Sequence, residues 1–237
     1  MKQSRRKRVL NVIGIILMVS LALSIVYAGV RFCIAPTEIA EGMPYEKVKS
    51  DYLLMLTQCI LGLFVMMLPS LLSRKWKIVV PDVICILYYV FLYCAIFLGE
   101  VFEFYYLVPH WDTVLHAFSG AMLGALGFEL VDFLNRDGGV KVSLSPLFTA
   151  VFAFSFALCI GALWEVYEFS FDALLGLNMQ KHTTADGVPL VGTEALLDTM
   201  KDLIVDAIAA FAVVTVGFLQ NTVLRRRSAE ERPEKET

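Results

Sequence analysis

The stretch His110-Trp111-Asp112-Thr113-Val114-Leu115-His116-Ala117-Phe118-Ser119-Gly120 opens an apolar run that continues to about Leu134. A run of this length is sufficient for a helix to cross a bilayer. Asp112 and His116 are four residues apart, so both lie on one face of such a helix. Because ionisable groups are costly inside a membrane segment, they usually have a partner or a function. The stretch therefore predicts a membrane helix that carries part of a polar site.

The composition indicates a polytopic membrane protein. Hydrophobic residues make up 58% of the 237 residues, charged residues make up only 18%, and the mean hydropathy is +0.68. Soluble domains are nearer half apolar and a quarter charged. The apolar excess is gathered into long runs, which is typical of membrane-spanning helices. The net charge is only −3, and no basic patch with interleaved aromatic residues indicates a nucleic-acid partner.

The apolar runs predict an all-α transmembrane bundle of about six spans. The predicted spans are 9–31, 51–72, 78–98, 111–134, 147–174 and 196–223. They form a single transmembrane domain over residues 1–224, and a charged cytoplasmic tail, expected to be disordered, follows at 225–237. The first run could alternatively be a signal peptide, but it is long for one, so we favour an uncleaved span. No run shows an obvious break or repeats another.

The distribution of Lys and Arg predicts the orientation of the chain. In a six-span arrangement, segments 1–8, 73–77, 135–146 and 225–227 fall on one side of the membrane, and they hold most of the basic residues. The intervening loops are acidic or nearly free of lysine. The positive-inside rule therefore places both termini in the cytoplasm.

Acidic residues form two further stripes on the last two spans. One stripe lies at the end of the fifth run and the other at the start of the sixth, with spacings of three or four that place each set on one helix face. With the predicted topology, both stripes approach the outer end of the fourth span and converge with Asp112 and His116 in the outer leaflet. The stripes consist of Glu165, Glu168 and Asp172, and of Asp198, Asp202 and Asp206.

Carboxylates that converge inside a membrane protein must be neutralised by a basic residue, a proton or a bound cation. Lys201 is the only basic residue expected nearby, and it lies on a different helix face from Asp198 and Asp202. Buried carboxylates either stay protonated or bind a cation, so a metal ion, protons or a water-filled cavity remain open. Carboxylates with an imidazole suit divalent ions such as Zn, Mn, Mg or Fe. The predicted metal ligands are Asp112, His116, Glu165, Asp198 and Asp202.

In an enzymatic version of this site, a metal ion would activate water, and Glu165 or Glu168 would act as the catalytic general base. A structural alternative remains for each position. Asp112 and Asp198 could be first-turn acids that complement the helix dipole. The whole cluster could be a hydrogen-bonded network that holds helices together.

Other residues are expected to have packing or surface roles. The small residues Gly120, Gly124 and Gly127 indicate close helix packing. Glu100, Glu103, His110 and His182 are expected in exposed loops. The five cysteines (Cys33, Cys59, Cys85, Cys94 and Cys159) show no metal-site spacing and are expected to pack as small apolar residues.

The order of the polar motifs resembles the YjdF-like inner-membrane proteins of bacteria. The motifs are Asp112-x-x-x-His116-x-x-x-Gly120, Glu165-x-x-Glu168, Gly192-Thr193 and Asp198-Thr199-x-x-Asp202. The resemblance covers about residues 50–220, although the loop at Gly192 is poorer in Gly, Gln and Trp than is usual in that family. A looser similarity exists to VanZ-like proteins, which are associated with resistance to lipid- or glycopeptide-directed antibiotics. These resemblances imply a multi-pass protein of the bacterial cytoplasmic membrane, and they imply no reaction.

Three functions therefore remain open from the sequence. The first is a cation or metal site that binds or acts on an envelope lipid or small molecule. The second is a small ion- or proton-coupled transporter, in which Glu129 and Asp132 would line the inner half of the path. The third is a structural membrane protein with a buried polar network. Membrane lipids are the expected partners, a homo-oligomer is open, and whether the chain is an enzyme stays undecided.

Overall fold

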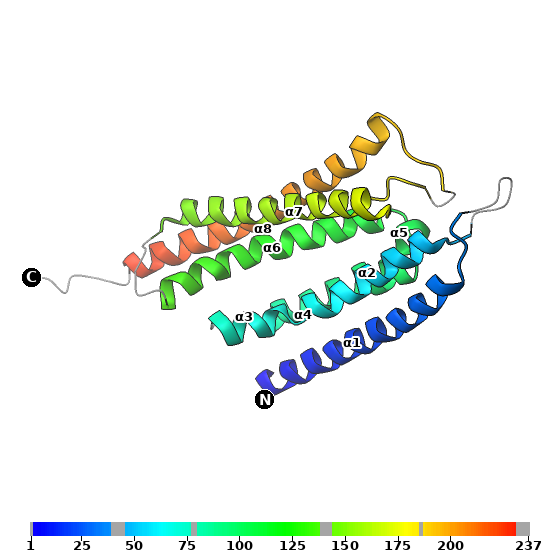
Figure 1. The fold of residues 1–237 in the computed structure, drawn as a ribbon. Coiled ribbons are helices and arrows are strands. Elements are labelled where there is room, and N and C mark those ends of the chain that lie inside the picture. Colours follow the sequence, from blue (N-terminus) through cyan, green and yellow to red (C-terminus); the bar gives the residue numbers. More distant parts are fainter. Residues whose placement is uncertain (1, 39–45, 77–79, 138–143, 185–186, 231–237) are drawn as a thin grey trace, which may run out of the picture. The chain divides into compact units, whose positions relative to one another are not determined.

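A computed structural model describes residues 2–38, 46–76, 80–137, 144–184 and 187–230. Within these residues the chain is helical and contains no strand, which confirms the predicted all-α class (Figure 1). The elements are α1 (Lys2–Ile34), α2 (Lys49–Val65), α3 (Leu68–Trp76), α4 (Asp82–Leu92), the π-helix η1 (Tyr93–Val101), α5 (Phe104–Leu107), α6 (Trp111–Asp137), α7 (Pro146–Leu175) and α8 (Thr193–Glu230).

Six helical segments are long and apolar enough to cross a membrane, as the sequence predicts. They are Arg5–Ile34, Lys49–Lys75, Asp82–Val101, Trp111–Leu134, Pro146–Leu175 and Thr193–Leu224. The chain is therefore a multi-pass membrane protein. The expectation of disorder from residue 225 is wrong for the first part of the tail, because α8 continues to Glu230. The remainder of the tail lies outside the described residues.

The second span is interrupted, although no break was expected. Helix α2 ends at Val65, a turn follows at residues 66–67, and α3 begins at Leu68. Pro69 has no N–H with which to bond the carbonyl of Val65, four residues earlier. The Tyr88 hydroxyl in α4 donates to that carbonyl instead, at 2.8 Å. A side chain from another span thus satisfies the carbonyl that the proline leaves without its helical partner.

The chain forms two compact units by its internal contacts. Unit 1 comprises residues 1–116 and 162–202, and unit 2 comprises residues 117–161 and 203–237. Helices α6, α7 and α8 contribute residues to both. The prediction of a single transmembrane domain over 1–224 stays a prediction.

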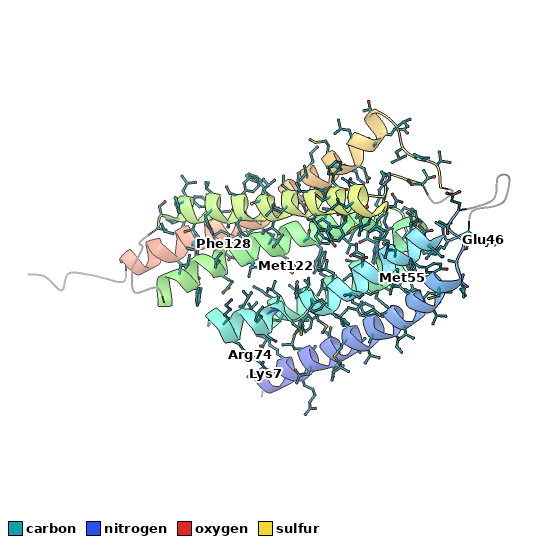
Figure 2. The ribbon with its side chains drawn as sticks, viewed as in Figure 1. Lys7, Glu46, Met55, Arg74, Met122 and Phe128 are labelled. Carbon is teal, nitrogen blue, oxygen red and sulfur yellow. The ribbon has the colours of Figure 1, made fainter. Side chains whose placement is uncertain are left out.

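In unit 1, α1 lies beside α2 and α4 (Figure 1). Leu17 and Leu21 from α1 and Met55 from α2 are nearly inaccessible at the centre of this group, and Ile96 of η1 packs on them. Lys7 and Arg74 lie at one end of these helices, and Glu46 lies at the other (Figure 2). Because Lys47 and Lys49 follow Glu46 closely, these charges do not test the predicted orientation, which stays a prediction.

Unit 2 confirms the close packing expected from the glycines of α6. A Cβ atom at Gly127 would lie 2.6 Å from the Cα of Ala153 in α7. A Cβ at Gly120 would lie 2.7 Å from the backbone oxygen of Asp206 in α8. These separations are too short for a methyl group, so the three helix segments approach one another because α6 lacks side chains there.

Replacing Gly127 by Ala should lower stability, since the new methyl group must displace the backbone of α7. We expect a loss of about 1–3 kcal/mol, which is typical of overpacking. Gly29→Ala in α1 is the matched control, because a Cβ there meets no atom within 4 Å. Alanine should stabilise that position by up to about 1 kcal/mol through its helix propensity. Thermal unfolding in detergent measures both, and equal shifts in the two variants would contradict the packing argument.

Candidate metal site

The local structure before α6 positions Asp112 and His116. His110 has a φ of 60°, a left-handed conformation that turns the chain after α5 into the start of α6 at Trp111. The indole N–H of Trp111 donates to the carbonyl of Cys94 in η1, at 3.3 Å. Asp112 then lies in the first turn of α6, and His116 lies one turn later. The start of α6 is thereby attached to the π-helix.

Four of the five predicted metal ligands come together in unit 1. The Nε2 atom of His116 lies 3.8 Å from Oδ1 of Asp112 and 3.8 Å from Oε1 of Glu165. Asp112, His116 and Asp202 can each offer one ligand atom, and these three atoms lie within 4.8 Å of one another. Helices α6, α7 and α8 therefore meet here through the residues that the stripes predicted.

These side chains are removed from solvent. The exposed fractions of His116, Glu165 and Asp202 are 8%, 6% and 4%, whereas Asp112 is half-buried. The Oδ1 atom of Asp202 is buried, and no described residue donates a hydrogen bond to it. A buried acceptor without a donor costs about 1–3 kcal/mol. A proton or a bound cation at this oxygen would remove that cost, so the donor set fits a metal ion.

The two remaining predicted residues lie at the border of the group. Glu168 and Asp198 are half-buried. Glu168 interacts electrostatically with Glu165 and Asp112, and Asp198 interacts with Asp112 and His116. Their carboxyl groups lie near the site, but among the described residues they are not within the three-ligand group.

Sequence reasoning missed the basic residue that balances part of this charge. The Nζ atom of Lys181 lies 2.9 Å from Oε2 of Glu100, and the two side chains are only 15% and 11% exposed. Two expectations are therefore wrong. Glu100 is not in an exposed loop, because residues 93–101 form η1. Lys201 is not the only basic residue near the acidic stripes, because the segment after α7 brings Lys181 to them.

Aromatic rings surround the Lys181 ammonium group. It lies 4.9 Å from the ring centroid of Tyr105 and 5.4 Å from that of Tyr106. Burial lowers the pKa of Lys181, but the charge and hydrogen bond of Glu100, together with Tyr106 and Glu168, outweigh burial and raise the pKa above its ordinary value. Burial and the nearby carboxylates raise the pKa of Tyr105 well above its usual range. Lys181 is therefore charged at neutral pH, and Tyr105 retains its hydroxyl proton.

The third acid of the α7 stripe orders the segment after α7. The Asp172 carboxylate accepts hydrogen bonds from the backbone N–H groups of Met179 (2.7 Å) and Gln180 (3.0 Å), and Nδ1 of His182 lies 3.4 Å away. The Gln180 amide donates to Oγ1 of Thr199 in α8, at 3.0 Å. Asp172 therefore has a structural role.

Among the described residues, the other positions singled out from the sequence do not belong to the three-ligand group. Asp206 belongs to unit 2, where it is buried and accepts a hydrogen bond from Ser119 at 3.2 Å. His110 is exposed as expected, and the side chains of Glu103 and His182 are 42% and 43% exposed. Among the cysteines, Cys59 and Cys85 are buried as expected for small packing residues, whereas Cys33 and Cys159 are exposed.

Replacing Glu100 by Gln should leave the Lys181 ammonium group buried without its counter-charge. We expect a loss of about 3–5 kcal/mol, and the double variant Glu100→Gln/Lys181→Met should recover most of it. Glu129→Gln, at an exposed carboxylate of α6, is the control and should change little. Thermal unfolding in detergent measures these differences. A double variant as unstable as the single one would contradict the pairing.

The Lys181–Glu100 pair also predicts that the stability of the folded protein depends on pH. The pKa of Lys181 in the folded protein is raised above its ordinary value of 10.5. The stabilisation of the folded state by the charged Lys181 is therefore complete below pH 10.5. It is lost as the pH rises through the folded-state pKa. Unfolding of the wild type should therefore become easier in that alkaline range, and this contribution should be missing in Glu100→Gln.

A family model described as a predicted membrane protein, DUF2238, matches residues 12–222. This range contains all six candidate residues of the site. No curated protein and no solved structure matches the chain. Because the match covers most of the 237 residues, the chain belongs to the DUF2238 family of predicted membrane proteins.

Proposed function

We propose that this protein is a multi-pass protein of the bacterial cytoplasmic membrane that binds a divalent metal ion through Asp112, His116 and Asp202. The observation that carries the proposal is the approach of their ligand atoms to within 4.8 Å, together with the buried Asp202 oxygen that no described residue bonds. The resemblance of the motifs to YjdF-like and VanZ-like proteins supports the location.

The donor set limits the kind of metal ion. One imidazole and two carboxylates are typical ligands of Zn, Mn or Fe, and a pure oxygen site for Ca or Mg would not use His116. Ligand atoms that share an ion at about 2.1 Å lie at most about 4.2 Å apart. Small rotations of the three side chains are therefore sufficient to close the group around one ion.

The residues beside the three ligands suggest chemistry on an envelope lipid. A metal ion at this position would lower the pKa of a bound water molecule. Glu165, with its carboxylate 3.8 Å from His116, is placed to be a fourth ligand or to accept a proton from that water, and Glu168 is one turn further along α7. The stripes lie near the ends of their spans, where lipid headgroups meet the protein. Hydrolysis or transfer at a headgroup is the reaction class that we infer.

The metal proposal predicts about one equivalent of a transition metal in detergent-purified wild type, measured by elemental mass spectrometry. His116→Ala and Asp202→Asn should each reduce the content at least about tenfold, because each removes a ligand. His110→Asn is the matched control, since it replaces an exposed histidine with a residue that tolerates the left-handed conformation.

Two outcomes would overturn the metal proposal. One is a wild type that holds no metal after reloading with Zn, Mn and Fe salts. The other is equal metal content in wild type and in both folded variants. Thermal unfolding with and without a chelator gives an independent readout, because a metal bound only by the folded protein raises its stability.

Transport is the second candidate, and the interrupted second span favours it, because discontinuous helices form ion sites in transporters. Two observations weigh against it. Tyr88 already occupies the carbonyl that the break leaves open. Glu129 and Asp132, the residues expected to line the inner half of a path, are exposed on α6 within unit 2. The buried group of Asp112, His116 and Asp202 therefore supports metal binding better than it supports ion or proton transport.

The proposed orientation predicts that both termini are cytoplasmic and that the segment between α7 and α8 is external. In a variant lacking the natural cysteines, an impermeant thiol reagent should label Val188→Cys in intact cells. The exposed fraction of Val188 is 59%, so its accessibility to the reagent is expected. Thr237→Cys should be labelled only after the cells are opened. Labelling of Thr237→Cys in intact cells would reverse the orientation.

A further inference from the structure

The approach of α8 to α6 decides whether the three proposed ligands can share an ion. Asp112 and His116 lie near the start of α6, and Asp202 lies near the start of α8, all within unit 1. Their ligand atoms lie within 4.8 Å of one another. Because a metal site tolerates displacements of only about 0.5 Å, its ligands need firm support from their surroundings. The segment between α7 and α8 contacts α8 and can give this support.

The first residues of this segment are held by side-chain hydrogen bonds. The Asp172 carboxylate accepts the N–H groups of Met179 and Gln180, as described above. The Asn178 side chain bonds the backbone of Thr183 twice, because its amide donates to the carbonyl at 3.0 Å and its oxygen accepts the N–H at 3.0 Å. The backbone of Gln180 therefore lies inside a turn that Asn178 closes.

Apolar packing and an ion pair hold the same turn. Leu177 and Met179 are each 4% exposed and form a buried cluster with Leu54 of α2. Lys181 follows Gln180 in the chain, and its ammonium group is paired with Glu100 of η1. The neighbours of Gln180 on both sides are thus fixed, one against α2 and the other against η1.

The Gln180 side chain connects this turn with α8. Its amide donates a hydrogen bond to Oγ1 of Thr199, at 3.0 Å, and both residues are half-buried. Thr199 precedes Asp202 by three residues, so the two side chains lie on one face of α8. A contact at Thr199 therefore acts on the helix face that carries the ligand.

The π-helix η1 contacts both parts of the ligand set. The Trp111 indole donates to the Cys94 carbonyl of η1, directly before Asp112 in α6. On the other side, Glu100 of η1 holds Lys181, next to Gln180. Single turns of π-helix occur frequently at functional sites. Contacts to one short helix thus determine where the ligands of α6 and the turn beside α8 lie.

We propose that Gln180 is a positioning residue: its bond to Thr199 keeps Asp202 beside Asp112 and His116. Gln180 is not a ligand and acts only through α8. The consequence for metal binding rests on the proposed metal function. The approach of Asp202 to α6 does not require a metal ion, so it can be tested separately.

The first test measures zinc affinity of the full-length protein in detergent, by competition with a chelating dye. Gln180→Met removes the amide at nearly constant volume, and Thr199→Val removes the accepting hydroxyl. Each should weaken Zn²⁺ binding at least about tenfold, as the loss of supporting contacts commonly does. The double variant should be no weaker than either single one, because all three lose the same contact. Thr199→Ser keeps a hydroxyl and should bind like the wild type.

Thr184→Val is the matched control. Its hydroxyl accepts the N–H of Val188 within the same segment, at 3.2 Å, so its removal should leave zinc affinity unchanged. A cavity of about 600 Å³ is lined by Asn178 and Lys181 among others, but not by Gln180 or Thr199, so the two test variants leave its wall intact. Equal thermal unfolding of the metal-free variants and control would show that Gln180→Met and Thr199→Val are folded.

The second test follows the approach of the helices without metal. In a variant lacking the natural cysteines, Asp112→Cys and Asp202→Cys should form a disulfide on oxidation, because a disulfide needs its two Cα atoms within about 7 Å. Adding Gln180→Met should slow this crosslinking about tenfold, whereas adding Thr184→Val should not.

The two tests separate the two proposals. A wild type that binds no zinc, with crosslinking that depends on Gln180, would end the metal proposal and support the positioning role. The positioning role would be overturned by a crosslinking rate that Gln180→Met leaves unchanged, or by no crosslinking even with Gln180 present. Wild-type zinc affinity in both folded variants, Gln180→Met and Thr199→Val, would also overturn it.

Discussion

The cost of removing a carboxylate from water is the constraint on which the arrangement of unit 1 depends. The buried acids of unit 1 meet this cost in different ways. Glu100 pairs with Lys181. Asp172 accepts backbone N–H groups of the following segment. Asp202 retains a buried oxygen that no described residue bonds. A cation or a proton at this oxygen would remove the cost, and the metal proposal is built on this position.

The segment between α7 and α8 connects the end of α7 with η1 and α8. The Asp172 carboxylate accepts a backbone hydrogen bond from the first residues of the segment, and the Gln180 amide donates to Thr199 of α8. Lys181 forms an ion pair with Glu100 of η1. Thr199 precedes Asp202 by one turn of α8, so the contact helps to hold Asp202 beside α6. Residues of this segment therefore contact the helix that carries Asp202, and several of them also line a cavity.

Much of this could be predicted from particular residues. The spans follow from length and apolarity, and the close packing of α6 follows from Gly120 and Gly127. The spacing of Asp112 and His116 and the acidic stripes predicted the approach of three helices, since spacing sets the helix face. The break after Val65 had a visible signal in Pro69, but the donor from Tyr88 did not. The π-helix had no local signal, and so Glu100 was wrongly expected to be exposed.

The sequence by itself determined the all-α class, the six spans and the face on which each ionisable residue lies, because these depend on periodicity and local hydropathy. Only the tertiary structure decided which charges meet. Lys181 is 81 positions from Glu100, and no short-range pattern links them. The choice between Lys181 and Lys201 as the counter-charge depends on how a polar segment folds back over the ends of the spans. That path is set by backbone hydrogen bonds to Asp172, which arise only once the chain is folded.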